Sequence, residues 1–246
     1  MKLAVAGKGG VGKTTLVALL AREAVSRGYR VLAVDADSNA TLAVTLGFPD
    51  PIVSLAEQED LIAQRAGAAG LVNLNPTVDD IPDRYGVEWD GIKLLVLGGI
   101  RRGGGGCACS ANTFLRALLR HLLLKRDEAV VVDMEAGVEH LGRGTAQGVD
   151  ALIVVVDPDR RSLNTVARIL PLAQEIGLRR IVAVGNKVRD PEEEAFIRDG
   201  LPRSVPLLGS IPLCEELGRV GRGGPLPSRA PPSVQDLFSQ LEVLTR

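Results

Sequence analysis

The chain has 246 residues, with 29 Lys and Arg against 30 Asp and Glu, so its formal net charge is −1. A balance so near zero argues against nucleic-acid binding through bulk positive charge, and 3% aromatic residues are too few for a base-stacking surface. The length suits one large domain with a sizeable core. Three cysteines are too few for a disulfide framework and predict cytosolic thiols or metal ligands.

The N-terminal segment is not expected to be a signal peptide, because GKGGVGKTT interrupts its apolar residues and no small-residue cleavage site follows. No apolar run reaches the roughly 18–20 residues of a membrane span. We therefore expect a soluble, cytoplasmic protein.

Short β-branched runs alternate with helical patterns along most of the chain, which is typical of βαβ units around a parallel sheet. In chain order, strands are predicted at 2–6, 30–34, 93–97, 129–133, 151–156, 180–184 and 205–208. Helices are predicted at 12–27, 113–125, 162–176 and 234–245. The fold class is thus α/β: a single domain over 1–246, with a mostly parallel twisted sheet flanked by helices on both faces.

Two stretches lack this regular pattern. Residues 49–89 predict an insertion or ordered loop, in which only 54–65 has a helical pattern. Residues 218–232 are rich in Gly, Pro and Arg and predict a loop.

The first strand and helix flank GKGGVGKT, residues 7–14, which matches the phosphate-binding pattern G-x-x-x-x-G-K-[ST]. Glycines let backbone N–H groups converge on phosphate oxygens, and the helix N-terminus adds a favourable dipole. Lys13 is expected to reach the β- and γ-phosphates, and the Thr14 hydroxyl to bind Mg²⁺. The predicted nucleotide-binding residues of this loop are Gly9, Gly10, Val11, Gly12, Lys13, Thr14 and Thr15.

A second lysine, Lys8, directly follows the first glycine of this loop. GKGGVGKTT resembles the deviant Walker A loop of the dimeric ATPases that include the nitrogenase iron protein and the partitioning and septum-positioning ATPases. The resemblance implies a homodimer that binds ATP or ADP with Mg²⁺ and hydrolyses ATP. It also implies that Lys8 reaches the partner subunit's nucleotide, where negative charge builds during phosphoryl transfer.

Three later stretches resemble the same family. In VDADSN, Asp37 resembles the catalytic aspartate that orients or deprotonates the attacking water. In DMEAG, Asp133 would hold Mg²⁺ through water and the Gly137 N–H would sense the γ-phosphate. Asn186, in GNK, resembles the adenine-reading residue. Carboxylates at strand ends are also common helix caps, so the order and spacing of these stretches carry the prediction.

Cys107 and Cys109 form a C-x-C pair between four glycines and a predicted helix. Thiolates suit Zn²⁺, Ni²⁺, Cu⁺ or an iron–sulfur cluster, and a tetrahedral thiolate site needs four of them. A two-fold dimer would bring two such pairs face to face. The alternative is that two small residues pack a loop. The third cysteine, Cys214, is expected to be a buried small hydrophobe.

The combination of GKGGVGKTT, the C-x-C pair and DMEAGVEHLGRGT resembles the maturation ATPases of nickel enzymes, in particular the nickel-inserting accessory proteins of carbon monoxide dehydrogenase and acetyl-CoA synthase. Members hold a metal between paired C-x-C motifs. The resemblance implies that Cys107 and Cys109 bind Ni²⁺ or Zn²⁺ at the dimer interface of an ATP-hydrolysing metallochaperone, whose client is one of those enzymes. His140 is either a transient metal or client contact or a structural residue.

Two other classes of function remain open. A positional switch for chromosome partitioning or septum placement would use the same ATP cycle to bind DNA or membrane, and an iron–sulfur carrier would use the same thiolates. The near-neutral charge disfavours DNA, and a single basic residue in SVQDLFSQLEVLTR disfavours a membrane helix. We expect the apolar stripe of that helix to dock on the domain itself. The stripe consists of Val234, Leu237, Phe238, Leu241 and Leu244.

Overall fold

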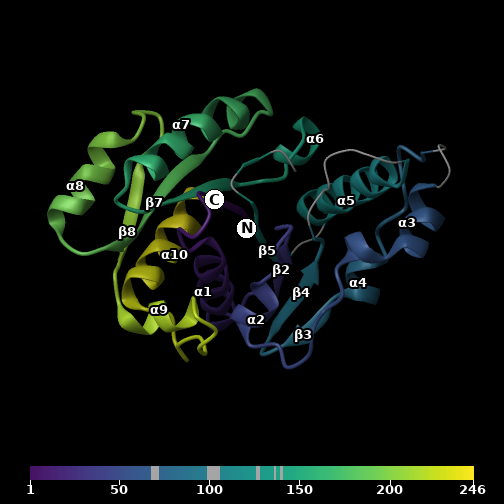
Figure 1. Cartoon of the computed structure of the whole chain (residues 1–246), viewed down its shortest axis with the longest axis horizontal. Coiled ribbons are helices and arrows are strands. Elements are labelled where there is room, and N and C mark those ends of the chain that lie inside the picture. Colours follow the sequence, from purple (N-terminus) through teal and green to yellow (C-terminus); the bar gives the residue numbers. More distant parts are fainter. Residues whose placement is uncertain (68–71, 99–105, 126–127, 136, 139–140) are drawn as a thin grey trace.

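In the computed structural model, which describes residues 1–67, 72–98, 106–125, 128–135, 137–138 and 141–246, eight strands form one sheet in the order β3-β4-β2-β5-β1-β6-β7-β8 (Figure 1). Neighbouring strands are parallel, except that β3 runs antiparallel to β4. The strands are β1 Lys2–Gly7, β2 Val31–Asp35, β3 Val87–Trp89, β4 Ile92–Val96, β5 Ala129–Asp133, β6 Ala151–Val156, β7 Ile181–Val188 and β8 Leu207–Pro212.

Helices cover both faces of this sheet, which confirms the predicted fold class. They are α1 Lys13–Ser26, α2 Leu42–Leu46, α3 Glu59–Ala66, α4 Ile81–Tyr85, α5 Gly106–Lys125, α6 Arg143–Ala146, α7 Arg160–Glu175, α8 Pro191–Gly200, α9 Glu215–Val220 and α10 Pro232–Leu244, with a short 3₁₀ turn, η1, at Leu55–Glu57. Of the helices in the described residues, none combines the length and apolarity needed to cross a membrane.

The central strands have few polar residues because both of their faces are covered. In β1, Leu3 and Val5 pack into one apolar cluster with residues of α1 and α10. Ala4 and Ala6 point to the other face, into a cluster with residues of α3, α5 and α7. The sheet therefore separates two hydrophobic cores.

The C-terminal helix α10 docks on the domain as expected. Figure 1 shows it beside α1, and it also contacts β8. Arg27, at the end of α1, forms an ion pair with Glu242 at 2.6 Å and lies over the ring of Phe238 at 4.8 Å. The predicted stripe is buried, with its last member partly buried; it comprises Val234, Leu237, Phe238, Leu241 and Leu244. Those residues are therefore part of the core.

The region 49–89 is more ordered than its sequence predicted. It contains η1, α3, α4 and β3, and Ile62 and Ile81 are buried in the core. Asp80, before α4, accepts hydrogen bonds from Arg65 at 2.7 Å and Arg84 at 3.1 Å. The helical pattern at 54–65 corresponds to η1 and α3, whereas α4 and β3 are too short to be predicted from their own patterns.

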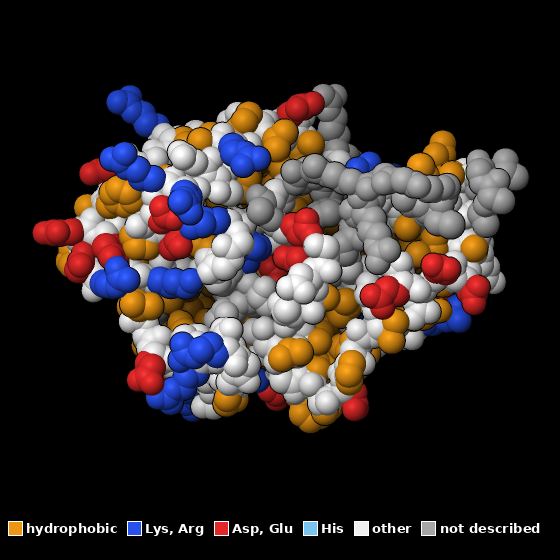
Figure 2. Space-filling model, viewed as in Figure 1, with side chains coloured by type: hydrophobic (Ala, Val, Ile, Leu, Met, Phe, Trp, Pro, Cys, Tyr) orange, Lys and Arg blue, Asp and Glu red, His pale blue; other side chains and the backbone are white. Residues whose placement is uncertain are grey.

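Other predicted boundaries also differ from the structure. β7 extends to Val188 rather than ending at 184, and β8 extends to Pro212 rather than ending at 208. The last strand begins at Leu207 rather than at 205, because Pro206 has no N–H with which to continue the ladder. The predicted loop 218–232 starts inside α9, where Glu215 in the first turn pairs with Arg219 at 2.8 Å. Over the described part of the face in Figure 2, Lys and Arg side chains are interspersed with Asp and Glu.

Candidate nucleotide-binding site

The carboxyl ends of parallel strands meet at one edge of a sheet, and most of the predicted site residues follow such ends. β1 leads into the glycine loop, β2 ends at Asp35, and β5 ends at Asp133. Gly7 has φ +146°, and a Cβ there would lie 2.6 Å from the Val155 carbonyl oxygen. Gly12 has φ +102°, and a Cβ there would collide with the Asn186 amide. Glycine is therefore required at both positions.

Thr14 and Asp133 are in direct contact at this edge. The Thr14 hydroxyl donates a hydrogen bond of 2.6 Å to Oδ2 of Asp133. The other oxygen, Oδ1, is buried and has no hydrogen-bond partner among the described residues. Burial raises the pKa of Asp133 from 3.8 to about 7; Asp35 adds to the rise, whereas the Thr14 bond and Lys13 oppose it. A carboxylate so placed favours a nearby cation.

Asp35 is a member of this cluster that the sequence analysis missed. It is fully buried, and the β2–β5 register places it opposite Asp133. Its carboxylate accepts the N–H groups of Leu42 at 2.9 Å and Asp37 at 3.1 Å. Burial raises the pKa of Asp35. The available signal was that two neighbouring buried strands both end in Asp.

Asp37 lies in the loop after β2 and is partly exposed. Its carboxylate accepts the Asn39 N–H at 2.8 Å, which forms a tight local turn. The next residue, Ser38, donates its N–H to Glu135 at 3.0 Å, so the loops after β2 and β5 are joined. Asp37 is thus near the Asp133 cluster, and its catalytic role stays a prediction.

Lys8 contacts residues of its own chain. Its Nζ lies 2.7 Å from Oδ2 of Asp159 and 3.9 Å from Oδ2 of Asp157, in the turn between β6 and α7. The hydrogen bond to Asp159 raises the pKa of Lys8 and lowers that of Asp159. Asp159 also caps α7 by accepting the Arg161 N–H. Reaching a partner's nucleotide would require Lys8 to leave both carboxylates.

A cavity of about 390 Å³ opens beside the glycine loop. Its lining includes Gly10, Gly12, Thr15, Asn186, Leu217 and Cys214. Asn186 donates its amide N–H to the Val11 carbonyl oxygen at 2.7 Å. Cys214, expected to be buried, is only half-buried, because it immediately precedes α9 at the cavity wall. The cavity therefore joins the glycine loop to Asn186, the predicted adenine-reading residue.

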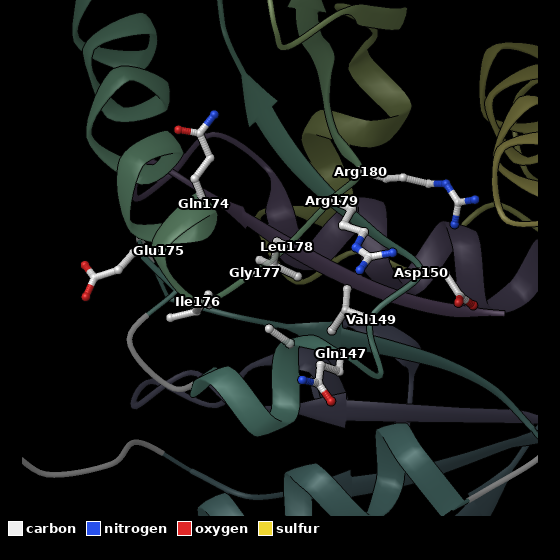
Figure 3. A pocket seen from close by; sticks show the side chains of 11 residues that line it. Gln147, Val149, Asp150, Gln174, Glu175, Ile176, Gly177, Leu178, Arg179 and Arg180 are labelled. Atoms are coloured by element: carbon white, nitrogen blue, oxygen red, sulfur yellow. The ribbon is translucent and has the colours of Figure 1, made fainter.

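A second hollow, of about 880 Å³, lies at the opposite end of the strands (Figure 3). It is lined by the segment after α6 and by the turn between α7 and β7. Figure 3 shows Asp150, Arg179 and Arg180 beside the starts of β6 and β7, with Gln147 across from them. None of the predicted site residues lies here, and the lining charges are of both signs.

The cysteine pair lies on a helix, which differs from the prediction. The predicted helix began after the pair, whereas α5 begins at Gly106 and includes Cys107 and Cys109. Cys109 is exposed, and its carbonyl oxygen accepts the Thr113 hydroxyl at 2.9 Å. Residues two apart on an α-helix are roughly 200° apart around its axis.

The described residues of one chain do not contain a group of three or more His, Cys, Asp and Glu arranged to hold a metal. Gly137 is buried beyond the end of β5, while His140 lies outside the described residues. Gly9 is exposed in the loop. The roles predicted for these residues stay predictions.

Comparison with known proteins gives a family context for this geometry. Residues 2–226 match the family model described as the CobQ/CobB/MinD/ParA nucleotide binding domain. The chain is 43% identical over 232 residues to the carbon monoxide dehydrogenase accessory protein CooC of Rhodospirillum rubrum, a match that covers 91% of this chain and 88% of that protein. It is 40% identical over 251 residues to an uncharacterised ATP-binding protein of Methanocaldococcus jannaschii, with 98% and 97% covered.

Solved structures show a similar fold. The septum site-determining protein MinD of Pyrococcus horikoshii OT3, solved with Mg-ADP, matches with a TM-score of 0.68 at 22% identity. The match covers 98% of this chain and 96% of that one. The fold of this chain is thus similar to that of a protein solved with Mg-ADP.

Proposed function

Since this chain belongs to the CobQ/CobB/MinD/ParA nucleotide-binding family and is an ATPase, we propose that it uses ATP hydrolysis to insert nickel into carbon monoxide dehydrogenase or acetyl-CoA synthase. The observation that carries the proposal is the similarity over nearly the whole chain to the carbon monoxide dehydrogenase accessory protein of Rhodospirillum rubrum. A C-x-C pair in the same chain supplies the thiol ligands that such a role requires.

The residues around Thr14 fit a bound Mg²⁺. The Thr14 hydroxyl and the buried, unpaired Oδ1 of Asp133 are oxygen donors of the kind that Mg²⁺ prefers. Bound Mg²⁺ would neutralise part of the charge on the β- and γ-phosphates. Lys13, which is 7% exposed, would bind the same phosphates from the start of α1.

The remaining roles belong to groups around the phosphates and base. Asp37 would orient the attacking water, and Gly137 would donate its N–H toward the γ-phosphate. Asn186 gives its amide N–H to Val11, so its amide oxygen remains an acceptor for the exocyclic amine of adenine. Lys8 would leave Asp159 and stabilise developing charge on the partner's nucleotide.

Nickel is the cargo in this proposal. Two chains related by a two-fold axis would supply four thiolates, from Cys107 and Cys109 of each. Nucleotide can change the metal affinity only if the ATP-bound and free forms hold the metal with different free energies. An ATP-dependent dimer meets this condition, because the four-thiolate site exists only when the chains are together.

The test is the metal content of anaerobically purified protein incubated with Ni²⁺ or Zn²⁺, with and without nucleotide. We expect one metal ion per two chains, lost in Cys107→Ser and in Cys109→Ser while ATP hydrolysis continues. Cys214→Ser is the matched control and should keep the metal, because Cys214 lies at the cavity wall rather than on α5.

Other results would favour the other classes of function. Iron with acid-labile sulfide at the same thiols would indicate an iron–sulfur carrier. Failure to bind metal under every nucleotide condition would contradict the metallochaperone and leave a positional switch. The buried stripe of α10 disfavours the membrane form of that switch, because these apolar side chains are already packed against α1 and β8.

A further inference from the structure

Two consecutive side chains hold two consecutive peptide groups of the glycine loop. Asn186 donates to the Val11 carbonyl oxygen at 2.7 Å, and Nζ of Lys187 donates to the Gly10 carbonyl oxygen at 2.6 Å. A trans peptide is planar, so its carbonyl oxygen and the following N–H point in opposite directions. Fixing the Gly10 carbonyl therefore fixes the direction of the Val11 N–H, which donates to the Lys8 carbonyl oxygen at 3.3 Å across the turn of the loop. The Val11 carbonyl and the Gly12 N–H are related in the same way.

The backbone of Lys187 is unusual in a way that serves this contact. Among the described residues, Asp90 and Lys187 are the non-glycine residues with positive φ, at +50° and +60°. Asp90 lies in the two-residue turn between β3 and β4, where positive φ is normal. Lys187 lies within β7, where this conformation is disfavoured for a residue with a side chain.

The pairing of β7 with β8 is interrupted at the same residue. Asn186 pairs with Ile211 and Val188 with Pro212, so the register shifts across Lys187. Such a bulge leaves the extra residue outside the ladder and redirects its side chain. Here the redirected side chain reaches the glycine loop. Backbone strain of this kind persists where the surrounding contacts enforce it, and it is concentrated at functional sites.

We propose that Lys187 is a positioning residue for phosphate binding: it holds the Gly10–Val11 peptide, whose N–H donates to the Lys8 carbonyl oxygen at 3.3 Å, and so fixes the turn of the glycine loop before a nucleotide binds. The proposal rests on nucleotide binding in this loop. Lys187 acts through the peptide and does not itself contact the base. Removing the Lys187 amine should therefore weaken the binding of every nucleotide that carries the same phosphates, and by the same factor.

Three substitutions separate the side chain from the backbone. Lys187→Met keeps most of the stem but removes the donor. Lys187→Gly also removes the donor, while it relieves the positive-φ strain. Lys187→Arg keeps a donor of similar reach. The control is Lys93→Met, which removes a lysine on β4 that pairs with Asp83 at 3.3 Å.

The experiment measures the dissociation constant of MgADP by titration of the full-length variants, with thermal unfolding of the nucleotide-free proteins alongside. We expect Lys187→Met and Lys187→Gly to lower the affinity for MgADP equally, by about tenfold, as for the loss of one hydrogen bond from a charged donor. Lys187→Arg should stay within a few fold of the unsubstituted protein, and Lys93→Met should not change. Lys187→Gly should unfold at a temperature no lower than that of Lys187→Met.

Three results would overturn the proposal. The first is MgADP affinity within twofold of the unsubstituted protein for Lys187→Met, and the second is restored affinity in Lys187→Gly, which would assign the effect to the backbone alone. The third is a changed preference for ADP over IDP, two nucleotides that differ only in the base, because it would place Lys187 against the base. Lys13→Ala tests separately whether the loop binds nucleotide. If Lys13→Ala no longer binds MgADP while Lys187→Met still does, the loop binds nucleotide and only the role proposed for Lys187 is wrong.

Discussion

The two carboxylate oxygens of Asp133 have different surroundings. Oδ2 accepts the Thr14 hydroxyl, whereas Oδ1 is buried without a partner among the described residues. Its raised pKa, about 7, means that the folded chain retains a proton here at pH values where the unfolded chain has lost it. This group therefore destabilises the fold increasingly as pH rises from about 4 to about 7, and fully above that range.

Asp133→Asn should consequently stabilise the nucleotide-free protein at pH 8. The gain should be at most about 4 kcal/mol, the free energy that corresponds to the pKa shift, because the amide oxygen can still accept from Thr14 while no charge is buried. Thermal unfolding at a series of pH values without Mg²⁺ measures this gain, which should shrink as the pH falls from 8 to 5.

The same variant should gain little stability from MgADP, because it lacks the charge that favours the cation. A stability difference that stays constant across pH would contradict the assignment to Asp133 ionisation. A full stabilising effect of MgADP on Asp133→Asn would show instead that this carboxylate does not hold the cation.

At the scale of elements, the start of α5 determines how the thiols can bind metal. α5 begins at Gly106, so Cys107 and Cys109 occupy helical positions two apart, and such positions are roughly 200° apart around a helix axis. The sequence predicted a later start, at 113, although Ser110 and Asn112 are of the residue types that favour a cap position. Chelation by both thiols would require the first turn of α5 to leave the helical conformation.

Ala111→Pro tests this requirement. Proline is tolerated in the first turn but disfavours helical conformation in the residue before it, so the helix should begin at 111 with Ser110 as its cap. If metal binding requires an unwound first turn, the substitution should raise Zn²⁺ affinity several fold, because the free energy of unwinding is no longer taken from the binding free energy. Competition with a chromogenic chelator measures the affinity, and weaker binding by Ala111→Pro would contradict the unwinding.

The elements that the sequence predicted well are those with long and continuous signals. The first strand, glycine loop and first helix follow one another directly, and β5 and β6 have the predicted bounds because each is an uninterrupted apolar run. By contrast, β3 is three residues long and all three are exposed, so it carries no alternation of buried and exposed residues. The helix α8 was missed although Asp190 and Pro191 are a recognisable start, and Asp190 caps it.

The candidate site was predictable where one contiguous motif supplied it. Lys13 and Thr14 come from such a motif, whereas Asp35 depends on the register between β2 and β5. Lys187 depends on a bulge, which has no sequence pattern of its own. The partners of Lys8 lie about 150 positions away and are set by the strand order. Contacts fixed by tertiary geometry were therefore those that the sequence did not predict.

For the whole molecule, the pair between Lys8 and Asp159 opposes the proposed dimer. A lysine held by its own chain cannot reach the partner's nucleotide, so dimerisation must break this pair. Both side chains are partly exposed, and ion pairs that water reaches are weak. The pair would therefore set a modest threshold for dimerisation, one that an ATP-bound partner overcomes by offering more negative charge.

Asp159→Asn should lower that threshold. Asparagine caps a helix about as well as aspartate, so α7 should keep its start while Lys8 loses its stronger carboxylate partner. With a non-hydrolysable ATP analogue and Mg²⁺, the variant should dimerise at a roughly two- to fivefold lower analogue concentration. Light scattering coupled to size-exclusion chromatography measures the dimer fraction.

Lys8→Ala is the counterpart of that variant, and together they separate the two roles of the lysine. It should bind MgADP as the unsubstituted chain does, because the ion pairs of the Lys8 side chain with described residues are those to Asp157 and Asp159. It should nevertheless fail to dimerise with the analogue or to hydrolyse ATP, because the charge supplied in trans is missing. Dimerisation of Lys8→Ala at the same analogue concentration as the unsubstituted chain would show that Lys8 is not a contact across the interface.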